Sequence, residues 1–131
     1  MEFSKHKSIY MQIADYFFGN ILLGKWKPGE KVPSVRQLAI DLEVNPNTVM
    51  RTYTLMQDKN IIVNQRGIGF YVTEEAPVKV KEIVKAQFLS DDLPEVFSTM
   101  EMLGMEIQEL TTHFHQWKST QIQEHHEKDQ Q

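Results

Sequence analysis

The sequence predicts an α+β chain that is mostly α-helical, with three short helices and a β-hairpin followed by a helical extension. Three observations predict this fold class. Apolar residues recur at helical spacing, capping residues stand where helices would begin, and two β-prone runs flank a glycine-containing loop. A length of 131 residues, at roughly 100–200 residues per domain, allows one domain or one small domain with an appendage.

The first helix is expected from Ser8 to about Gly24, because apolar residues at spacings of three and four mark one helical face. Gly24 ends it, and the proline and glycine residues of segment 25–33 indicate turns. The apolar residues of this face are Ile9, Tyr10, Ile13, Phe17 and Ile21.

Two further helices begin at clear capping signals. Ser34, with Gln37 three residues later, forms a capping box and predicts a helix from Val35 to about Leu42. Asn45 is the next N-cap, and a proline at the first helical position predicts a helix over Pro46–Asp58. The residues expected to face the core from this third helix are Val49, Tyr53 and Met56.

A β-hairpin is expected next. The β-prone stretches 61–64 and 70–73 enclose the loop Gln65–Gly69. The Gly67-Ile68-Gly69 sequence resembles a fragment of a dinucleotide-binding fingerprint, but that motif requires a strand leading into a helix. Glycine between two strands instead serves tight loop geometry.

The C-terminal part is expected to be helical. One helix is predicted over 78–89, with a break at Ser90–Pro94. A last helix of about 24 residues, roughly 36 Å long at 1.5 Å per residue, is too long for the small module alone to cover. Its apolar residues follow a heptad spacing that is typical of paired helices: Val96, Met100, Leu103, Ile107, Leu110, Phe114 and Trp117.

Helix, short turn, helix and hairpin is the order of a winged helix-turn-helix, so the predicted fold is this domain with a C-terminal helical dimerisation extension. The expected parts are a winged domain over 1–75, a two-helix dimerisation region over 76–118, and a polar, disordered tail over 119–131.

The composition and charge of the chain exclude some classes of protein and favour others. The absence of cysteine excludes disulfide frameworks and thiol nucleophiles. Residues 1–73 carry nine Lys and Arg against six acidic residues, a net of +3, whereas residues 74–131 carry five against twelve, a net of −7. This asymmetry favours a nucleic-acid module with a non-binding appendage. No apolar run is long enough for a membrane span and the N-terminus does not resemble a signal peptide, so we expect a cytoplasmic protein with no membrane contact.

The third helix carries the chemistry of a DNA-reading element. On a helical wheel Asn47, Met50, Arg51 and Thr54 share a face opposite the core. Asparagine can pair with adenine, arginine with guanine or a phosphate, and the helix N-terminus with a phosphate. At the hairpin tip, Arg66 can reach a minor groove or a flanking phosphate. The residues predicted to bind DNA are Ser34, Arg36, Asn45, Asn47, Thr48, Arg51, Gln65, Arg66 and Gly67.

Several of these residues also have simpler interpretations. Asn45 can act only as a cap, and Arg51 can be a solvated charge. Arg36 can pair with Asp41 or Glu43 instead of DNA.

A family resemblance rests on motifs spread over about residues 8–73. These are Tyr10-x-Gln12-Ile13-Ala14, Pro28-Gly29-x-Lys31-Val32-Pro33-Ser34-x-Arg36-x-Leu38-Ala39, Val44-Asn45-Pro46-Asn47-Thr48-Val49-x-Arg51-x-Tyr53 and Gly67-x-Gly69-x-x-Val72. They resemble the DNA-binding domain of GntR-family bacterial transcription regulators. That resemblance implies DNA contacts from Arg36, Asn45, Asn47, Thr48, Arg66 and Gly67. Pro46 stands where many members have Arg or Lys, so one frequent contact is missing.

The Asn-Pro-Asn-Thr-Val motif and the short C-terminal part resemble the YtrA-like subgroup. This resemblance implies two helices used for dimerisation, autoregulation of the operon, and frequent linkage to ABC-transporter genes. The expected function is a sequence-specific, homodimeric repressor on a pseudo-palindromic operator. The expected dimer contacts are Met100, Leu103, Ile107, Leu110, Phe114 and Trp117, with packing inside one chain as the alternative.

Three other functions are alternatives to sequence-specific DNA binding. A protein-interaction adaptor, in which the winged helix binds a partner protein through its exposed face and carries a coiled coil, is one alternative, and flat salt dependence of duplex binding would favour it. A metal sensor is disfavoured because His113 and His115 point to different helix faces, and a small-molecule effector held near Phe88, Met100, Met102 and Met105 stays open. No motif predicts catalysis, a metal or a cofactor.

Overall fold

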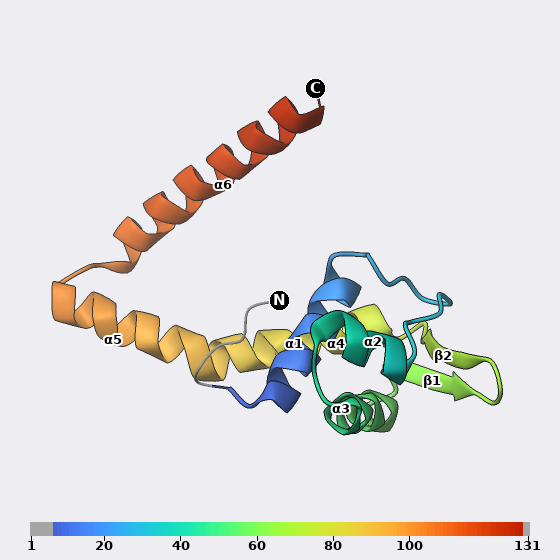
Figure 1. Ribbon diagram of the computed structural model, residues 1–131. Helices are drawn as coiled ribbons and strands as arrows, with labels where there is room; N and C mark the ends of the chain where they lie inside the picture. The colour runs from blue at the N-terminus through green and yellow to red at the C-terminus, as the bar shows by residue number, and fades with distance from the viewer. Residues whose placement is uncertain (1–6, 130–131) are drawn as a thin grey trace. The chain divides into compact units, whose positions relative to one another are not determined.

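The computed structural model describes residues 7–129, apart from the side chains of residues 127 and 129 (Figure 1). The chain divides into two compact units, Met1–Ala86 and Gln87–Gln131. The first contains three helices, a β-hairpin and most of a fourth helix, and the second is entirely helical where it is described.

Three helices build the first unit: α1 (Ile9–Leu22), α2 (Val35–Leu42) and α3 (Pro46–Asp58). The bounds predicted for α2 and α3 are confirmed, and both begin at the predicted caps. Ser34 Oγ accepts the Gln37 backbone N–H at 3.0 Å, and Asn45 Oδ1 accepts the Asn47 backbone N–H at 2.8 Å. Each cap satisfies one backbone donor that the first helical turn leaves without a partner.

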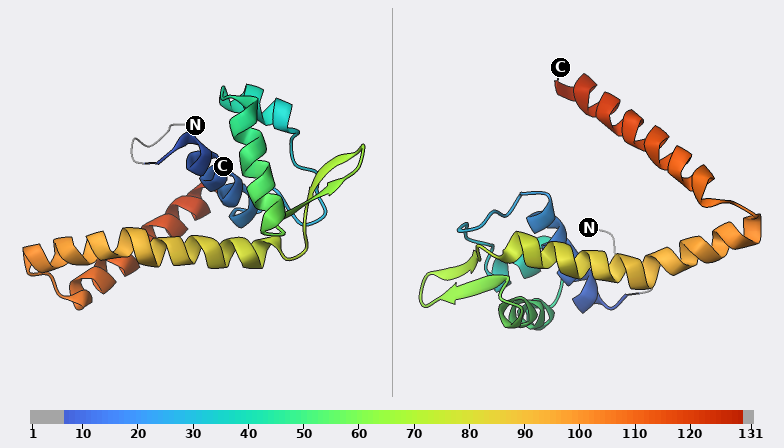
Figure 2. Two further views of the ribbon diagram at one scale, coloured as in Figure 1. Left: turned by 90° about the horizontal axis from the view of Figure 1, so that it is seen from below. Right: turned by 180° about the vertical axis from the view of Figure 1, so that it is seen from behind.

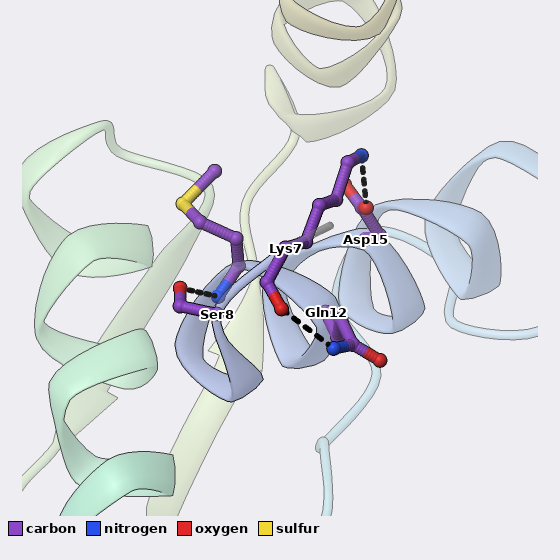
Figure 3. A network of polar contacts seen from close by, with 5 residues as sticks. Lys7, Ser8, Gln12 and Asp15 are labelled. Atoms are coloured by element: carbon purple, nitrogen blue, oxygen red, sulfur yellow. Dashed lines mark hydrogen bonds and ion pairs between the residues drawn. The ribbon is translucent and has the colours of Figure 1, made fainter. Parts of the chain in front are cut away.

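The start of α1 is held by polar contacts (Figure 3). Ser8 Oγ accepts the Met11 backbone N–H at 3.2 Å, and Gln12 Nε2 donates to the Lys7 carbonyl at 2.9 Å. Lys7 Nζ lies 2.6 Å from Asp15 Oδ2. These contacts fix the first two turns of α1, which carry Tyr10.

The hairpin pairs β1 (Ile62–Gln65) with β2 (Gly69–Val72) in antiparallel register, with Ile62 opposite Val72 and Gln65 opposite Gly69. Figure 2 shows it projecting from the helices of its unit. Segment 29–32 lies along the other edge of β2, where Val32 N–H donates to the Phe70 carbonyl at 2.9 Å and Gly29 N–H to the Val72 carbonyl at 2.8 Å. The sequence predicted only turns for this segment, because its partner strand lies 40 residues further along the chain.

The core lies between the three helices and the base of the hairpin. Val49, Tyr53 and Met56 of α3 are fully buried, as predicted. Four aromatic rings of this core pack edge to face in a chain of three contacts. The ring centroids are 4.7 Å apart for Phe17 and Trp26, 5.6 Å for Phe17 and Tyr53, and 5.1 Å for Tyr53 and Phe70. The Tyr53 hydroxyl donates to the Pro33 carbonyl at 2.5 Å. This packing fixes α3 by its inner face and leaves its outer face free.

The fourth helix, α4 (Ala76–Gln87), begins inside the predicted dimerisation region but packs on the first unit. Ala76 and Val80 are fully buried in its core, and Ile83 and Val84 pack against it. The structure therefore divides the chain after Ala86, later than the predicted boundary at residue 75.

The second unit contains a π-helical turn, η1 (Phe88–Asp92), and the helices α5 (Leu93–Leu103) and α6 (Ile107–Asp129). The predicted break at Ser90–Pro94 is wrong, since the chain stays helical there. Leu93 N–H donates to the Phe88 carbonyl in a π-type bond, and Pro94 lies in the first turn of α5, where its missing N–H costs little.

The single long helix predicted through the heptad residues is also wrong, because Gly104 divides it. Gly104 adopts φ 69°, its N–H donates to the Glu101 carbonyl at 3.2 Å, and Met105 N–H donates to the Met100 carbonyl at 2.9 Å. This is a Schellman motif, which ends a helix and needs a left-handed residue.

The expected disordered tail is helical where it is described. In the structure α6 continues through residues 119–129, and residues 130 and 131 lie outside the described part. The sequence after Gly104 contains neither glycine nor proline, so no helix breaker opposes this continuation.

Candidate nucleic-acid interface

The outer face of α3 carries the side chains that the sequence assigned to DNA. Asn47, Met50, Arg51 and Thr54 are exposed. Opposite them lie the core residues of the same helix, so the predicted division of α3 into two faces is confirmed. Thr48 is half-buried, and its carbonyl accepts the hydroxyl of buried Thr52 at 3.3 Å.

The beginning of α3 is suited to an anion. Asn45 uses its side-chain oxygen to cap the helix and is exposed, as are Pro46 and Asn47. A capped helix start still presents backbone N–H groups and the positive end of the helix dipole. The predicted capping role of Asn45 is confirmed, and this end of α3 can additionally accept a phosphate.

Arg36, in the first turn of α2, presents a free cation among the described residues. It is exposed, and among the described side chains it pairs with neither of the carboxylates proposed as alternatives. Asp41 instead accepts a hydrogen bond from Gln37 Nε2 at 2.8 Å. The guanidinium is therefore available to an external anion.

Arg51 has a contact that the sequence did not predict. Its guanidinium carbon lies 4.1 Å from the centroid of the Tyr10 ring on α1. The Thr52 hydroxyl contacts the Tyr10 carbonyl at 3.4 Å, so two adjacent residues of α3 meet the same residue of α1. Because 41 residues separate Tyr10 from Arg51, no local sequence pattern indicates this pair.

The hairpin tip presents Gln65, Arg66 and Gly67, all of them exposed. Gly67 adopts φ 76°, and Ile68 N–H closes the turn on the Gln65 carbonyl at 2.9 Å. A side chain at Gly67 would strain this conformation. The turn therefore holds the Arg66 backbone at the end of the hairpin with its side chain toward solvent.

Lys31 packs against the base of the hairpin turn. A Cβ atom on Gly69 would stand 2.7 Å from Lys31 Cε, so the lysine stem lies where only glycine leaves room. The sequence does not predict this contact, because Lys31 and Gly69 lie far apart in the chain.

The six residues predicted for dimerisation do not share one helix. Met100 and Leu103 lie on α5 and the other four on α6. Leu103, Ile107, Phe114 and Trp117 remain 52–63% exposed in the single chain, whereas Met100 is buried and Leu110 half-buried. The rings of Phe114 and Trp117 stack at 6.3 Å. Phe97 and Met102 of α5 are also exposed, and they are not among the predicted dimer contacts because they lie outside the heptad spacing.

The remaining features of the described residues concern metal, membrane and small-molecule sites. Among the side chains that the structure describes, no group of three or more His, Asp or Glu could hold a metal ion, and none of the described helices is long and apolar enough to cross a bilayer. An open hollow of about 530 Å³ in the second unit is lined in part by Met100, Met105 and Leu110.

Burial raises the pKa of Tyr53, with a smaller contribution from Tyr16. That tyrosine belongs to the core, not to the interface.

Comparison with known proteins identifies relatives over most of the chain. Residues 9–72 match the family described as bacterial regulatory proteins, gntR family. The HTH-type transcriptional regulator YhcF of Bacillus subtilis is 36% identical over 109 residues, covering 83% of this chain and 88% of that protein. The HTH-type transcriptional repressor YtrA of the same organism is 35% identical over 109 residues, covering 83% of this chain and 80% of that protein. A solved GntR-family regulator from Bacteroides thetaiotaomicron superposes with a TM-score of 0.72 at 37% identity, covering 87% of this chain and 99% of the other.

Proposed function

This chain belongs to the GntR family as a YtrA-like, DNA-binding transcription regulator rather than an enzyme, and on that premise we propose that it is a homodimeric repressor of a pseudo-palindromic operator. The observation that carries the proposal is the outer face of α3, which presents an amide, a guanidinium and a capped helix start together. The chemistry of these groups suits base edges and phosphates in a major groove.

In this proposal α3 enters the major groove and the hairpin lies at its flank. Asn47, in the first turn of α3, reads a base edge, since the N-terminal residues of a recognition helix make such contacts. Arg36, the exposed Asn45 and the half-buried Thr48 bind nearby phosphates or bases. Arg66 enters the minor groove or contacts a flanking phosphate, with Gln65 and Gly67 lying close to the backbone.

The proposed dimer forms through the second unit. Leu103, Ile107, Phe114 and Trp117 are more than half exposed in the single chain. Apolar side chains gathered on neighbouring elements typically mark a protein interface. A two-fold dimer places two copies of α3 on half-sites that are one helical turn, or a multiple of it, apart.

Repression is proposed because the relative YtrA is a repressor, and we place the protein in the cytoplasm, where bacterial DNA lies. The experiment that tests the function is selection of bound duplexes from a random pool by the full chain. The selected duplex is then titrated at several salt concentrations, and the oligomeric state is measured by sedimentation. We expect two related half-sites, a dimer at micromolar concentration, and affinity that falls steeply as salt rises.

Three variants then locate the binding face. Arg36→Ala is expected to cost about 1–3 kcal/mol of binding free energy. Asn47→Ala should relax the base preference at one position, whereas Arg66→Ala should weaken binding to all sequences. Lys81→Ala is the matched control, because Lys81 is an exposed cation on α4. Selection of no duplex, or flat salt dependence, would refute DNA binding and favour a protein-interaction adaptor.

A further inference from the structure

The contact between Tyr10 and Arg51 joins the beginning of α1 to the second turn of α3. The guanidinium carbon lies 4.1 Å from the ring centroid, which places the cation over the ring face. Tyr10 is half-buried, and its backbone is tied to α3 through the Thr52 hydroxyl. The ring therefore has a fixed place from which to orient the exposed arginine side chain.

Contact with a ring face leaves the hydrogen-bonding capacity of arginine intact. The guanidinium carries five N–H donors around its planar edge. Among the described residues, Arg51 forms no ion pair and donates no hydrogen bond, and its side chain is exposed. The ring thus restricts the orientation of the group while its donors stay available to an external acceptor.

The position of the pair favours a phosphate as that acceptor. Arg51 lies one turn after Asn47, beyond the first turn of α3, where base contacts concentrate. Its guanidinium lies over the Tyr10 ring of α1. A planar fork matches two oxygens of one phosphate.

We propose that Tyr10 is a positioning residue for DNA binding, which holds the Arg51 guanidinium so that its edge binds one backbone phosphate of the operator. This inference rests on the proposed DNA-binding function. It assigns a role in binding to α1, and it makes Arg51 a contact that does not depend on the base sequence.

The test uses the whole 131-residue chain and the duplex selected from the random pool, with dissociation constants measured by fluorescence anisotropy at several salt concentrations. Tyr10→Leu removes the ring face and is expected to weaken binding roughly tenfold and to reduce the salt slope by about one. Binding to a scrambled duplex should weaken by the same factor. Tyr10→Phe keeps the ring and should restore most of the affinity.

Two further proteins separate positioning from a general loss of stability. Tyr16→Leu removes a half-buried tyrosine from the same helix, one whose ring packs on Trp26, and should leave the salt slope unchanged. Tyr10→Leu combined with Arg51→Ala should bind no more weakly than Arg51→Ala alone, because both changes remove one interaction.

The inference is overturned if Tyr10→Leu binds like the wild type, if its salt slope does not change, or if its effect adds fully to that of Arg51→Ala. Those outcomes leave the proposed function standing, because the wild-type protein still binds the selected duplex. If the wild-type protein binds no duplex, the proposed function fails and this inference fails with it.

Discussion

The Tyr53→Phe variant tests how the inner face of α3 is fixed. The Tyr53 side chain is fully buried, and its hydroxyl donates to the Pro33 carbonyl at 2.5 Å. Phenylalanine keeps the ring and its contacts, so the change removes one hydrogen bond and leaves a carbonyl without that donor. Such a loss costs about 1–3 kcal/mol of unfolding free energy. For a domain of this size that lowers the melting temperature by roughly 5–15 °C.

The pH dependence gives a second, independent measurement of the same hydroxyl. Burial raises the pKa of Tyr53 above its ordinary value of 10.0. Above pH 10 the tyrosine hydroxyl loses its proton in the unfolded chain but keeps it in the folded chain, so the unfolding free energy falls as pH rises. Below pH 10 this contribution is fully present. The difference between wild type and Tyr53→Phe should therefore shrink in the alkaline range.

The assay is urea denaturation followed by circular dichroism, at neutral pH and again above pH 10. Tyr71→Phe is the control, because Tyr71 is only half-buried and its hydroxyl donates to no described residue. It should stay within about 0.5 kcal/mol of the wild type. A Tyr53→Phe protein as stable as the wild type, or a stability difference that does not change with pH, would refute the reasoning.

Three other predictions follow from the structure. Gly69→Ala should lower the unfolding free energy by about 1–3 kcal/mol in denaturant titrations, because φ is 135° and the new Cβ meets Lys31. Gly19→Ala, in the interior of α1 where the new Cβ has open space, should instead raise the unfolding free energy by roughly 0.5–1 kcal/mol. Equal changes in the two variants would contradict the role given to the backbone conformation of Gly69. Asn45→Ala removes the α3 cap and should lower the unfolding free energy by about 0.5–2 kcal/mol. The same variant should bind the operator more weakly in anisotropy titrations. Unchanged affinity would show that the helix start does not contact DNA. Trp117→Ser should weaken the proposed dimer by about 2–4 kcal/mol in sedimentation experiments, and an unchanged dimer would place the interface elsewhere.

Local signals in the sequence predicted the elements of the first unit well. Ser34 and Asn45 cap their helices with backbone bonds to residues only two or three positions away, so the sequence contains both partners of each contact in one short window. The outer face of α3 followed directly from helical periodicity, since its inner residues are apolar and buried.

Contacts between distant segments could not be predicted in this way. The pairing of segment 29–32 with β2 and the contact of Arg51 with Tyr10 both join residues about 40 positions apart. Neither leaves a repeating pattern in the sequence. They arise from the packing of the whole unit, and they decide which polar side chains remain free for a ligand.

The error at Gly104 has a different cause. The heptad spacing continues from Leu103 to Ile107, so periodicity alone indicates one uninterrupted helix. A glycine in a helical pattern also predicts a stop, and here that local signal prevailed over the periodic one. The same spacing therefore occurs on two separate helices.

The Schellman stop at Gly104 also bears on how related regulators coexist in one cell. Its corner is formed by backbone hydrogen bonds and a single glycine, so the side chains of α5 and α6 are not needed to form it. Those side chains can then diverge between gene duplicates without loss of the corner. If the chain pairs through this unit as proposed, such divergence would let each paralogue pair with its own kind.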